Sequence, residues 1–267
     1  MTTTPTITRP ESLAALSRSA LYALLARTLA YPTADRLAQV RAQIAPLLRE
    51  TEFGPAPLRH SVAQVLARLD SAAPQEWERA YIDLFTLTVS PDSPTWETAY
   101  SASDVIQQSQ RMADIAGFYR AHGLQVGGTD RERPDHIATE LEFLSFMARK
   151  EAVALESLGP EQVDECRRTQ VHFLADHLGS WGPALGRRIQ RLAQGSVYAP
   201  VGALLSAWLE AEMAALDARP TEQLDQPAPL PQPGDDACGP SDGCDLPCGP
   251  AGASVPAATF IASQSIR

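Results

Sequence analysis

The sequence predicts an all-α protein built as a single helical-bundle domain of about nine helices. Apolar residues recur three and four positions apart through most of residues 11–217. No segment alternates apolar and polar residues for long enough to predict a strand. Prolines and glycines fall between the periodic segments, where helices end. With 267 residues, 44% of them hydrophobic, the chain is long enough to bury a sizeable core.

Four amphipathic helices are predicted in the first third of the chain. Each carries a stripe of apolar residues at helical spacing and is bounded by proline or glycine. Pro46 lies inside the second segment, so we expect that helix to be kinked or shortened there. The four segments are residues 11–30, 34–50, 58–69 and 74–87.

A loop and a hinge interrupt the rest of the bundle. The stretch TVSPDSPTWETAY, residues 88–100, has two prolines and no helical period, which predicts an ordered loop. Residues 123–134 are rich in glycine and charge, which indicates a hinge inside the domain. The remaining helices are expected at residues 102–122, 135–157, 160–178, 183–193 and 197–216.

Both ends of the chain are predicted to lie outside the bundle. Residues 1–10 form a flexible N-terminus, and residues 218–267 change character, with nine of the 22 prolines. After Leu216 there are seven acidic residues against two arginines, a net charge of −5. Because this segment has few large apolar groups, its burial cannot offset the entropy of ordering. The sequence therefore predicts a disordered C-terminal tail.

Composition limits the class of protein. The net charge of −10 argues against binding of nucleic acid through its phosphates. No apolar run reaches the roughly 20 residues that a membrane span needs, so no stable membrane insertion is expected. The first residues, MTTTPTITRPESLAAL, lack the pattern of an export signal. Together with reduced thiols, this predicts a cytoplasmic protein.

Aromatic residues mark two candidate sites. Trp77, Tyr81 and Phe85 are four residues apart, so they share one face of a helix. That stripe is interpreted either as core packing or as a partly open groove for an apolar peptide. In the loop, Pro94 and Trp96 predict a rigid turn that packs an aromatic ring. Glu97 either caps the following helix or pairs with a cationic partner.

The adjacent residues Asp135 and His136 precede an almost wholly apolar helix. Pro134 is favoured at a first helical position, which places Asp135 in the first turn, where the helix dipole stabilises a carboxylate. The dipole gives no reason for His136. Glu140 lies one turn further on, so an imidazole–carboxylate pair is sterically feasible.

Enzymatic and metal-dependent alternatives find little support. A metal site could use Glu132, His136 and Glu140, but the other histidines supply no matching second half. There is no nucleophile elbow and no phosphate loop, so no cofactor is expected, although weak nucleotide or cofactor contact stays open. In the tail, Cys238, Cys244 and Cys248 lack a fourth ligand and the usual spacing. Thiols without a fixed partner and adventitious or regulatory metal binding both remain open there.

Four stretches of the sequence, taken together, resemble the TorD/DmsD family of redox-enzyme maturation chaperones. Within that family, the resemblance is strongest to chaperones of type II dimethyl-sulfoxide-reductase-like molybdenum enzymes. The stretches are WERAYIDLF (77–85), SPTWETAY (93–100), MADIAGFYRAHGL (112–124) and RPDHIATELEFL (133–144).

The resemblance implies a cytoplasmic chaperone that is not an enzyme. Such a protein binds the catalytic subunit of an exported molybdenum oxidoreductase, commonly through its twin-arginine leader, and delays export until the cofactor is inserted. The family fold is an all-α bundle, and a hinge before the Asp-His pair permits a monomer or a domain-swapped dimer. The client-binding residues that the resemblance implies are Trp77, Tyr81, Phe85, Trp96, Glu97, Tyr100, Asp135 and His136. Glu140, with Asp135 and Glu97, is a candidate acid for the leader's arginines.

Overall fold

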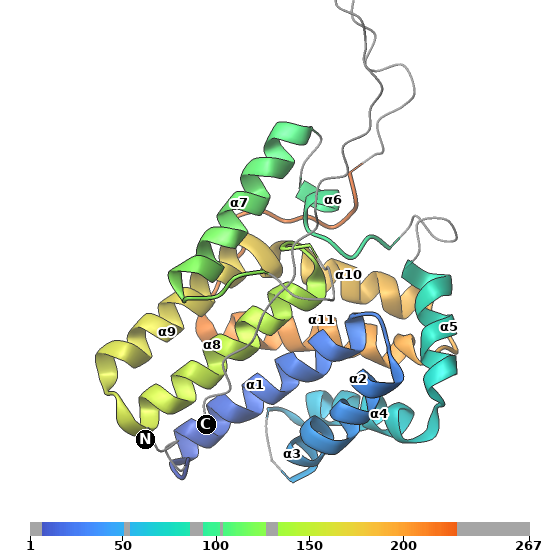
Figure 1. The fold of residues 1–267 in the computed structure, drawn as a ribbon, viewed down its shortest axis with the longest axis horizontal. Coiled ribbons are helices and arrows are strands. Elements are labelled where there is room, and N and C mark those ends of the chain that lie inside the picture. The colour runs from blue at the N-terminus through green and yellow to red at the C-terminus, as the bar shows by residue number, and fades with distance from the viewer. Residues whose placement is uncertain (1–6, 51–53, 86–92, 102–103, 127–132, 229–267) are drawn as a thin grey trace, which may run out of the picture.

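The computed structural model describes residues 7–50, 54–85, 93–101, 104–126 and 133–228. Within these ranges the chain is helical and contains no strand, which confirms the predicted all-α class (Figure 1). An isolated antiparallel bridge joins Trp96 to His136. No described helix combines the length and the apolar character that crossing a bilayer requires. Half of the predicted hinge, residues 127–132, lies outside the described residues, as does the tail from residue 229.

Two long helices form the centre of the bundle. Helix α1 (Pro10–Leu29) packs along α8 (Ile137–Ser157), and α11 (Tyr198–Leu216) lies beside them (Figure 1). Leu21, Leu24 and Leu25 of α1 are completely buried in this layer. The stripe of apolar residues that predicted α1 is therefore the stripe that faces the core.

The segment predicted as one helix at 34–50 is a continuous helical run with a wider turn in its middle. It consists of α2 (Ala34–Gln39), the π-helical turn η1 (Val40–Ile44) and α3 (Ala45–Glu50). Pro46 has no N–H to donate and would crowd the carbonyl four residues back in a regular helix. The π turn just before Pro46 widens the helix there, so the run continues past the position where a kink or an earlier end was expected.

The other elements follow the predicted order with shifted boundaries. The loop at 88–100 ends in a short helix, α6 (Thr98–Ser101), which was not predicted. Helix α10 (Gly179–Leu192) begins four residues before the predicted start and contains Pro183 in its interior. The further elements are α4 (Ala56–Ser71), α5 (Pro74–Phe85), α7 (Val105–Ala121), α9 (Pro160–Phe173) and the π turn η2 (Leu174–Leu178).

The end of the described chain is more ordered than the sequence predicted. Residues 218–228, here named the C-terminal strap, extend from α11 across η2, α10 and α6. Backbone hydrogen bonds tie the strap to these elements, and the side chain of Leu224 packs against the core. The prediction of disorder from residue 218 is thus wrong for this stretch, because its backbone finds partners on the bundle.

Candidate functional site

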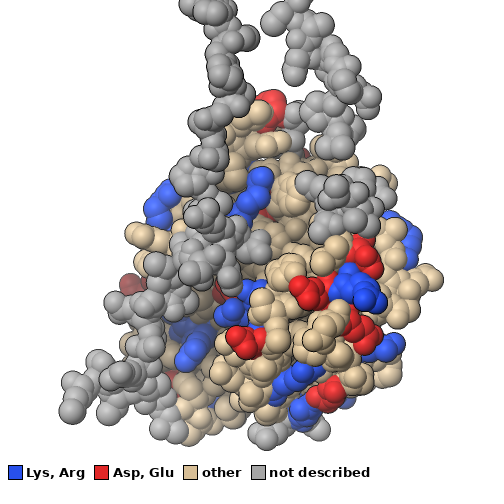
Figure 2. Space-filling view, turned by 45° about the vertical axis from the view of Figure 1, so that its right-hand side comes forward, with Lys and Arg blue, Asp and Glu red and all other residues tan. Residues whose placement is uncertain are grey.

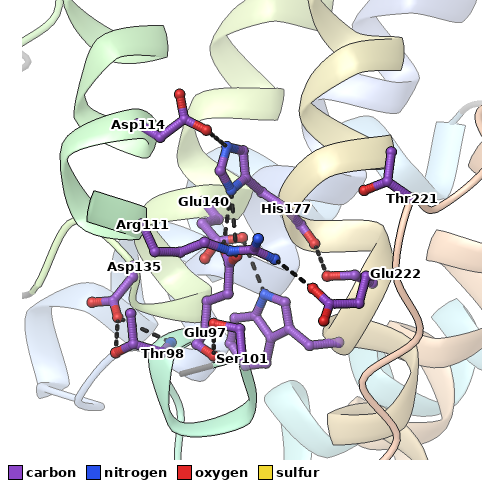
Figure 3. A network of polar contacts seen from close by, with 12 residues as sticks. Glu97, Thr98, Ser101, Arg111, Asp114, Asp135, Glu140, His177, Thr221 and Glu222 are labelled. Atoms are coloured by element: carbon purple, nitrogen blue, oxygen red, sulfur yellow. Dashed lines mark hydrogen bonds and ion pairs between the residues drawn. The ribbon is translucent and has the colours of Figure 1, made fainter. Parts of the chain in front are cut away.

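Five polar side chains meet inside the bundle and form a buried polar cluster: Glu97, Arg111, Asp135, Glu140 and His177 (Figure 3). The carboxyl groups of Glu97, Asp135 and Glu140 and the imidazole of His177 are fully buried. The five residues come from the loop before α6, from α7, from the residues before α8, from α8 and from η2. The predicted acids therefore lie together, but in the interior and not on an open surface.

Backbone pairing brings two of the resemblance stretches side by side. Glu97 N donates to Asp135 O at 2.8 Å, and Ile137 N donates to Thr95 O at 2.7 Å. These bonds flank the bridge between Trp96 and His136. SPTWETAY and RPDHIATELEFL thus form one structural unit, which explains how the cluster can draw on both.

Asp135 is held by donors on three sides. Its Oδ2 accepts from Thr98 N at 3.2 Å and from Thr98 Oγ1 at 2.7 Å. Arg133 donates through Nε to Oδ1 at 2.8 Å and through Nη2 to Oδ2 at 3.0 Å. Because α8 begins at Ile137, Asp135 does not lie in the first helical turn, and that prediction was wrong. Thr98 and Arg133, not the helix dipole, stabilise this carboxylate.

His136 is the N-cap of α8. Its Nδ1 accepts a hydrogen bond from Ala138 N at 3.2 Å, a role that a neutral imidazole can fill. The helix start therefore accounts for a histidine that the sequence left unexplained.

Glu97 connects the cluster to the other half of the bundle. Its carboxylate pairs with Arg111 Nε and lies 3.3 Å from His177 Nδ1. The other ring nitrogen, His177 Nε2, lies 3.4 Å from the exposed carboxylate of Asp114 without hydrogen-bond geometry. Glu97 is thus a buried anchor, a different role from the capping and open pairing that the sequence suggested.

Glu140 is the group whose protonation the site changes most. Burial, followed by the negative charges of Glu97 and Asp135, raises the pKa of Glu140 well above its usual value. Trp181 Nε1 donates to Glu140 Oε2 at 3.3 Å and opposes this shift only in part. A protonated Glu140 leaves two carboxylates to balance the guanidinium groups of Arg111 and Arg133. The cluster is then close to neutral, as a buried group of charges should be.

The aromatic stripe of α5 packs on the interior. Trp77, Tyr81 and Phe85 surround Tyr198 of α11, with ring centroids 5.2, 6.2 and 5.3 Å from it. Trp77 and Phe85 are buried, whereas Tyr81 is half-buried and also contacts Tyr31. The stripe is therefore mainly core packing with one partly accessible ring.

The loop aromatics divide in the same way. Tyr100 is buried against Trp181, with centroids 5.2 Å apart, and its hydroxyl donates to Pro94 O at 3.0 Å. Trp96 is half-buried, and the guanidinium carbon of Arg133 lies 5.6 Å from its ring centroid, within cation–π range. Trp96 is the loop residue that a ligand can reach directly.

A pocket of about 430 Å³ opens beside α5. Acidic and basic side chains are interspersed on the face shown in Figure 2, so no single-sign patch dominates it. The pocket lies between α5 and the turn that joins α10 to α11. Its lining includes the exposed Glu76, Arg79 and Asp83 and the apolar Leu84, Leu192 and Val197.

Nothing in the described part of the chain supports the metal alternative. These residues contain no group of three His, Cys, Asp or Glu side chains placed to hold a metal ion. Glu132, Cys238, Cys244 and Cys248 lie outside the described ranges. Cys166, which is described, is a free and buried thiol.

Several residues of the cluster and its surroundings escaped the sequence analysis. Arg111 and Trp181 lie in none of the stretches singled out, Arg133 was quoted only as the start of RPDHIATELEFL, and His177 was considered only as a metal ligand. Glu97 and His177 are 80 residues apart in the sequence, so no local spacing links them. The acids Glu97, Asp135 and Glu140 were the one sign in the sequence that basic partners were needed.

Comparison with known proteins identifies the family. A model of the family described as "Nitrate reductase delta subunit" matches residues 53–186, half of the chain. The selenate reductase assembly chaperone protein of Thauera selenatis is 34% identical over 105 residues, 39% of this chain and 52% of that protein. The perchlorate reductase assembly chaperone protein of Dechloromonas aromatica is 29% identical over 177 residues, 63% and 75% of the two chains. Chaperone protein TorD of Vibrio cholerae is 25% identical over 184 residues, 67% and 80% of the two chains.

The chain spans about half the length of the first of these relatives and three quarters or more of the other two. The family match includes the aromatic stripe, the loop, Asp135 and His136, and therefore the stretches that form the buried polar cluster. Its relatives are chaperones and not enzymes. The chain therefore belongs to the nitrate reductase delta subunit family, the TorD family of maturation chaperones for molybdenum enzymes.

Proposed function

We propose that this protein acts in the cytoplasm on the catalytic subunit of an exported molybdenum oxidoreductase. It binds that subunit, including the twin-arginine leader, and assists cofactor insertion and assembly before export. The observation that carries the proposal is the family match, together with relatives named as assembly chaperones of selenate and perchlorate reductases. No observation on the described residues favours a metal-dependent function instead.

The residues implied in client binding divide into two groups by burial. Tyr81 and Trp96 are half-buried, so a leader peptide can contact their rings directly. The others hold the loop and α5 in the geometry that presents those rings. This supporting group consists of Trp77, Phe85, Glu97, Tyr100, Asp135, His136 and Glu140, all of them buried.

Burial also changes which acids can meet the leader's arginines. Glu97, Asp135 and Glu140 were the candidates, but all three are fully buried inside the cluster. Glu76 and Asp83 are exposed on α5 and line the pocket beside an apolar wall. We assign the leader's guanidinium groups to this pair, since a twin-arginine leader presents two arginines and then an apolar stretch.

Calorimetric titration with the leader peptide of the co-purifying catalytic subunit tests the proposal. We expect a dissociation constant on the order of micromolar, about −8 kcal/mol, because export requires release. Trp96→Ala and Tyr81→Ala should each weaken binding about tenfold, as central aromatic contacts do.

Leu158→Ala is the control, since this exposed leucine follows α8 far from both rings. It should leave the affinity unchanged. If the purified protein binds neither the leader nor the mature subunit, the proposed function is wrong.

A further inference from the structure

The C-terminal strap lies over the two segments that carry Glu97 and His177. Figure 3 shows Thr221 and Glu222 of the strap close to the cluster. Three backbone N–H groups of the strap donate to carbonyl oxygens of the bundle. Two of these acceptors lie close to His177 in the sequence, one before it and one after it, and the third lies shortly after Glu97. The bonds join Thr221 N to Ala175 O (2.9 Å), Leu224 N to Ser180 O (3.0 Å) and Ala228 N to Ala99 O (2.8 Å).

Two acidic side chains of the strap face two arginines. Glu222 lies 3.5 Å from Arg111 Nη2, and Asp225 lies 3.5 Å from Arg187 Nη2. Between them, Leu224 packs partly buried against the core. The surface beneath the strap is thus matched to an extended segment with two acids three residues apart and an apolar side chain between them.

The strap is attached by contacts of modest strength. The side chains of Glu222 and Asp225 are 51% and 57% exposed, and ion pairs of that kind contribute little to stability. The strap forms no helix or strand with the rest of the bundle over its described length. It can therefore leave the surface without unfolding the helices.

A buried donor beneath the strap has unused bonding capacity. Arg111 Nη2 is buried and makes no hydrogen bond within the described structure. The carboxylate of Glu222 lies 3.5 Å from it. A better-placed acidic ligand would gain this hydrogen bond, because an unsatisfied buried donor is costly.

We propose that the surface between α6 and the η2–α10 junction binds an extended acidic segment of the client, and that the strap is its built-in competitor. This inference rests on the proposed function, since the client supplies the segment. The leader and the acidic segment would occupy different places: the leader would lie at α5 and the loop, and the acidic segment would take the place of the strap.

Amide hydrogen exchange, measured on the full chain alone and with the co-purified catalytic subunit, tests whether the client displaces the strap. When the subunit binds, the amides of Thr221, Leu224 and Ala228 should exchange at least about tenfold faster, because their acceptors are taken. If the subunit binds and the strap stays protected, the inference is wrong and the proposed function stands. A subunit that does not bind at all contradicts both.

Weakening the strap gives a result that general damage to the protein would not. The double variant Glu222→Ala, Asp225→Ala should bind the subunit about fivefold more tightly, since it removes two exposed ion pairs of the competitor. Asp217→Asn is the matched control, because Asp217 pairs only with the exposed Arg219 just before the strap's contacts, and it should leave the affinity unchanged. Unchanged or weaker binding by the double variant contradicts the inference.

A synthetic peptide of the strap supplies an independent readout. The peptide ARPTEQLDQPA, residues 218–228, should compete with the subunit for the full chain. The same peptide with lysine at both acidic positions should not, because it repels Arg111 and Arg187. Equal competition by the two peptides would show that the acids do not select the ligand and would overturn the inference.

Discussion

At the residue scale, the pairing of each charged side chain determines how the buried polar cluster is stabilised. Asp135 and Glu97 are paired with Arg133 and Arg111. Glu140 accepts a hydrogen bond from Trp181, while burial and the nearby charges of Glu97 and Asp135 raise the pKa of Glu140 well above its usual value. The pKa shift of Glu140 is therefore a statement about stability.

The first prediction concerns the pH dependence of unfolding. Because the folded-state pKa of Glu140 is raised above the ordinary value of 4.5, its contribution is fully present below about pH 4.5 and is lost as pH rises toward the folded-state value. Glu140→Gln is neutral and nearly isosteric. The variant should therefore unfold at a higher temperature than the native protein at about pH 8, and the difference between their unfolding temperatures should be smaller at about pH 5. Thermal unfolding across this range measures it.

Glu142→Gln provides the matched control on the same helix. Glu142 is one-third exposed and lies 3.5 Å from Arg27, away from the cluster. Its substitution should change the unfolding temperature little and equally at both ends of the range. A Glu140→Gln variant that follows the native curve at every pH would show that Glu140 titrates normally.

The residue scale also shows what a sequence can and cannot predict about a site. The stretch RPDHIATELEF correctly directed attention to Asp135, His136 and Glu140, because polar groups at the start of an apolar helix need a reason. Their roles required three dimensions. Thr98 and Arg133 bind Asp135, and only the position of the helix start makes His136 an N-cap. The sequence therefore predicted a recognition surface at three residues whose side chains the structure buries.

At the scale of the elements, α10 and α11 cross with their backbones in close contact. A Cβ added at Gly186 would lie 2.7 Å from Ser206 N and 2.8 Å from Gly202 O. A Cβ at Gly202 would lie 2.6 Å from Gly186 O. The two glycines therefore permit backbone-to-backbone contact, and this crossing fixes the surface on which the strap lies.

That contact predicts opposite effects on stability for alanine substitutions at two glycines. Gly186→Ala should destabilise the protein by about 2 kcal/mol, because the new methyl meets backbone that cannot rotate away. Gly117→Ala, in the middle of α7 with nothing within 4 Å of the added Cβ, should instead stabilise it by about 0.5–1 kcal/mol. Urea unfolding of both variants measures the difference. Similar effects at the two positions would contradict the close crossing.

Helices were predicted well where the signal is local. The periodic stripes of residues 11–30 and 135–157 correspond to α1 and α8, since burial of one face is written into the spacing of apolar residues. The π turns η1 and η2, the short α6 and the early start of α10 were missed. At the start of α10, a Cβ added at Gly179 would lie 2.6 Å from Met213 Sδ of α11, a neighbour that no local pattern records.

At the scale of the whole molecule, the all-α bundle could be predicted, but the assembly of its interior could not. The cluster joins residues from the loop before α6 to η2, and the strap returns from the far end of the chain to the same place. Disorder from residue 218 was predicted from the scarcity of large apolar side chains, a criterion that takes no account of backbone hydrogen bonds. The three backbone hydrogen bonds of the strap are invisible to that criterion.

The central claim is that this chain is required for a molybdenum enzyme to acquire its cofactor, and molybdenum content measures it most directly. The catalytic subunit that co-purifies with this chain is isolated from cells with and without the chain's gene, and its molybdenum is measured per subunit. We expect the molybdenum occupancy of the subunit to fall by about tenfold without the gene, because an assembly factor prevents that loss. Occupancy should return when the native sequence is supplied. Full occupancy in the absence of the chain would contradict the account.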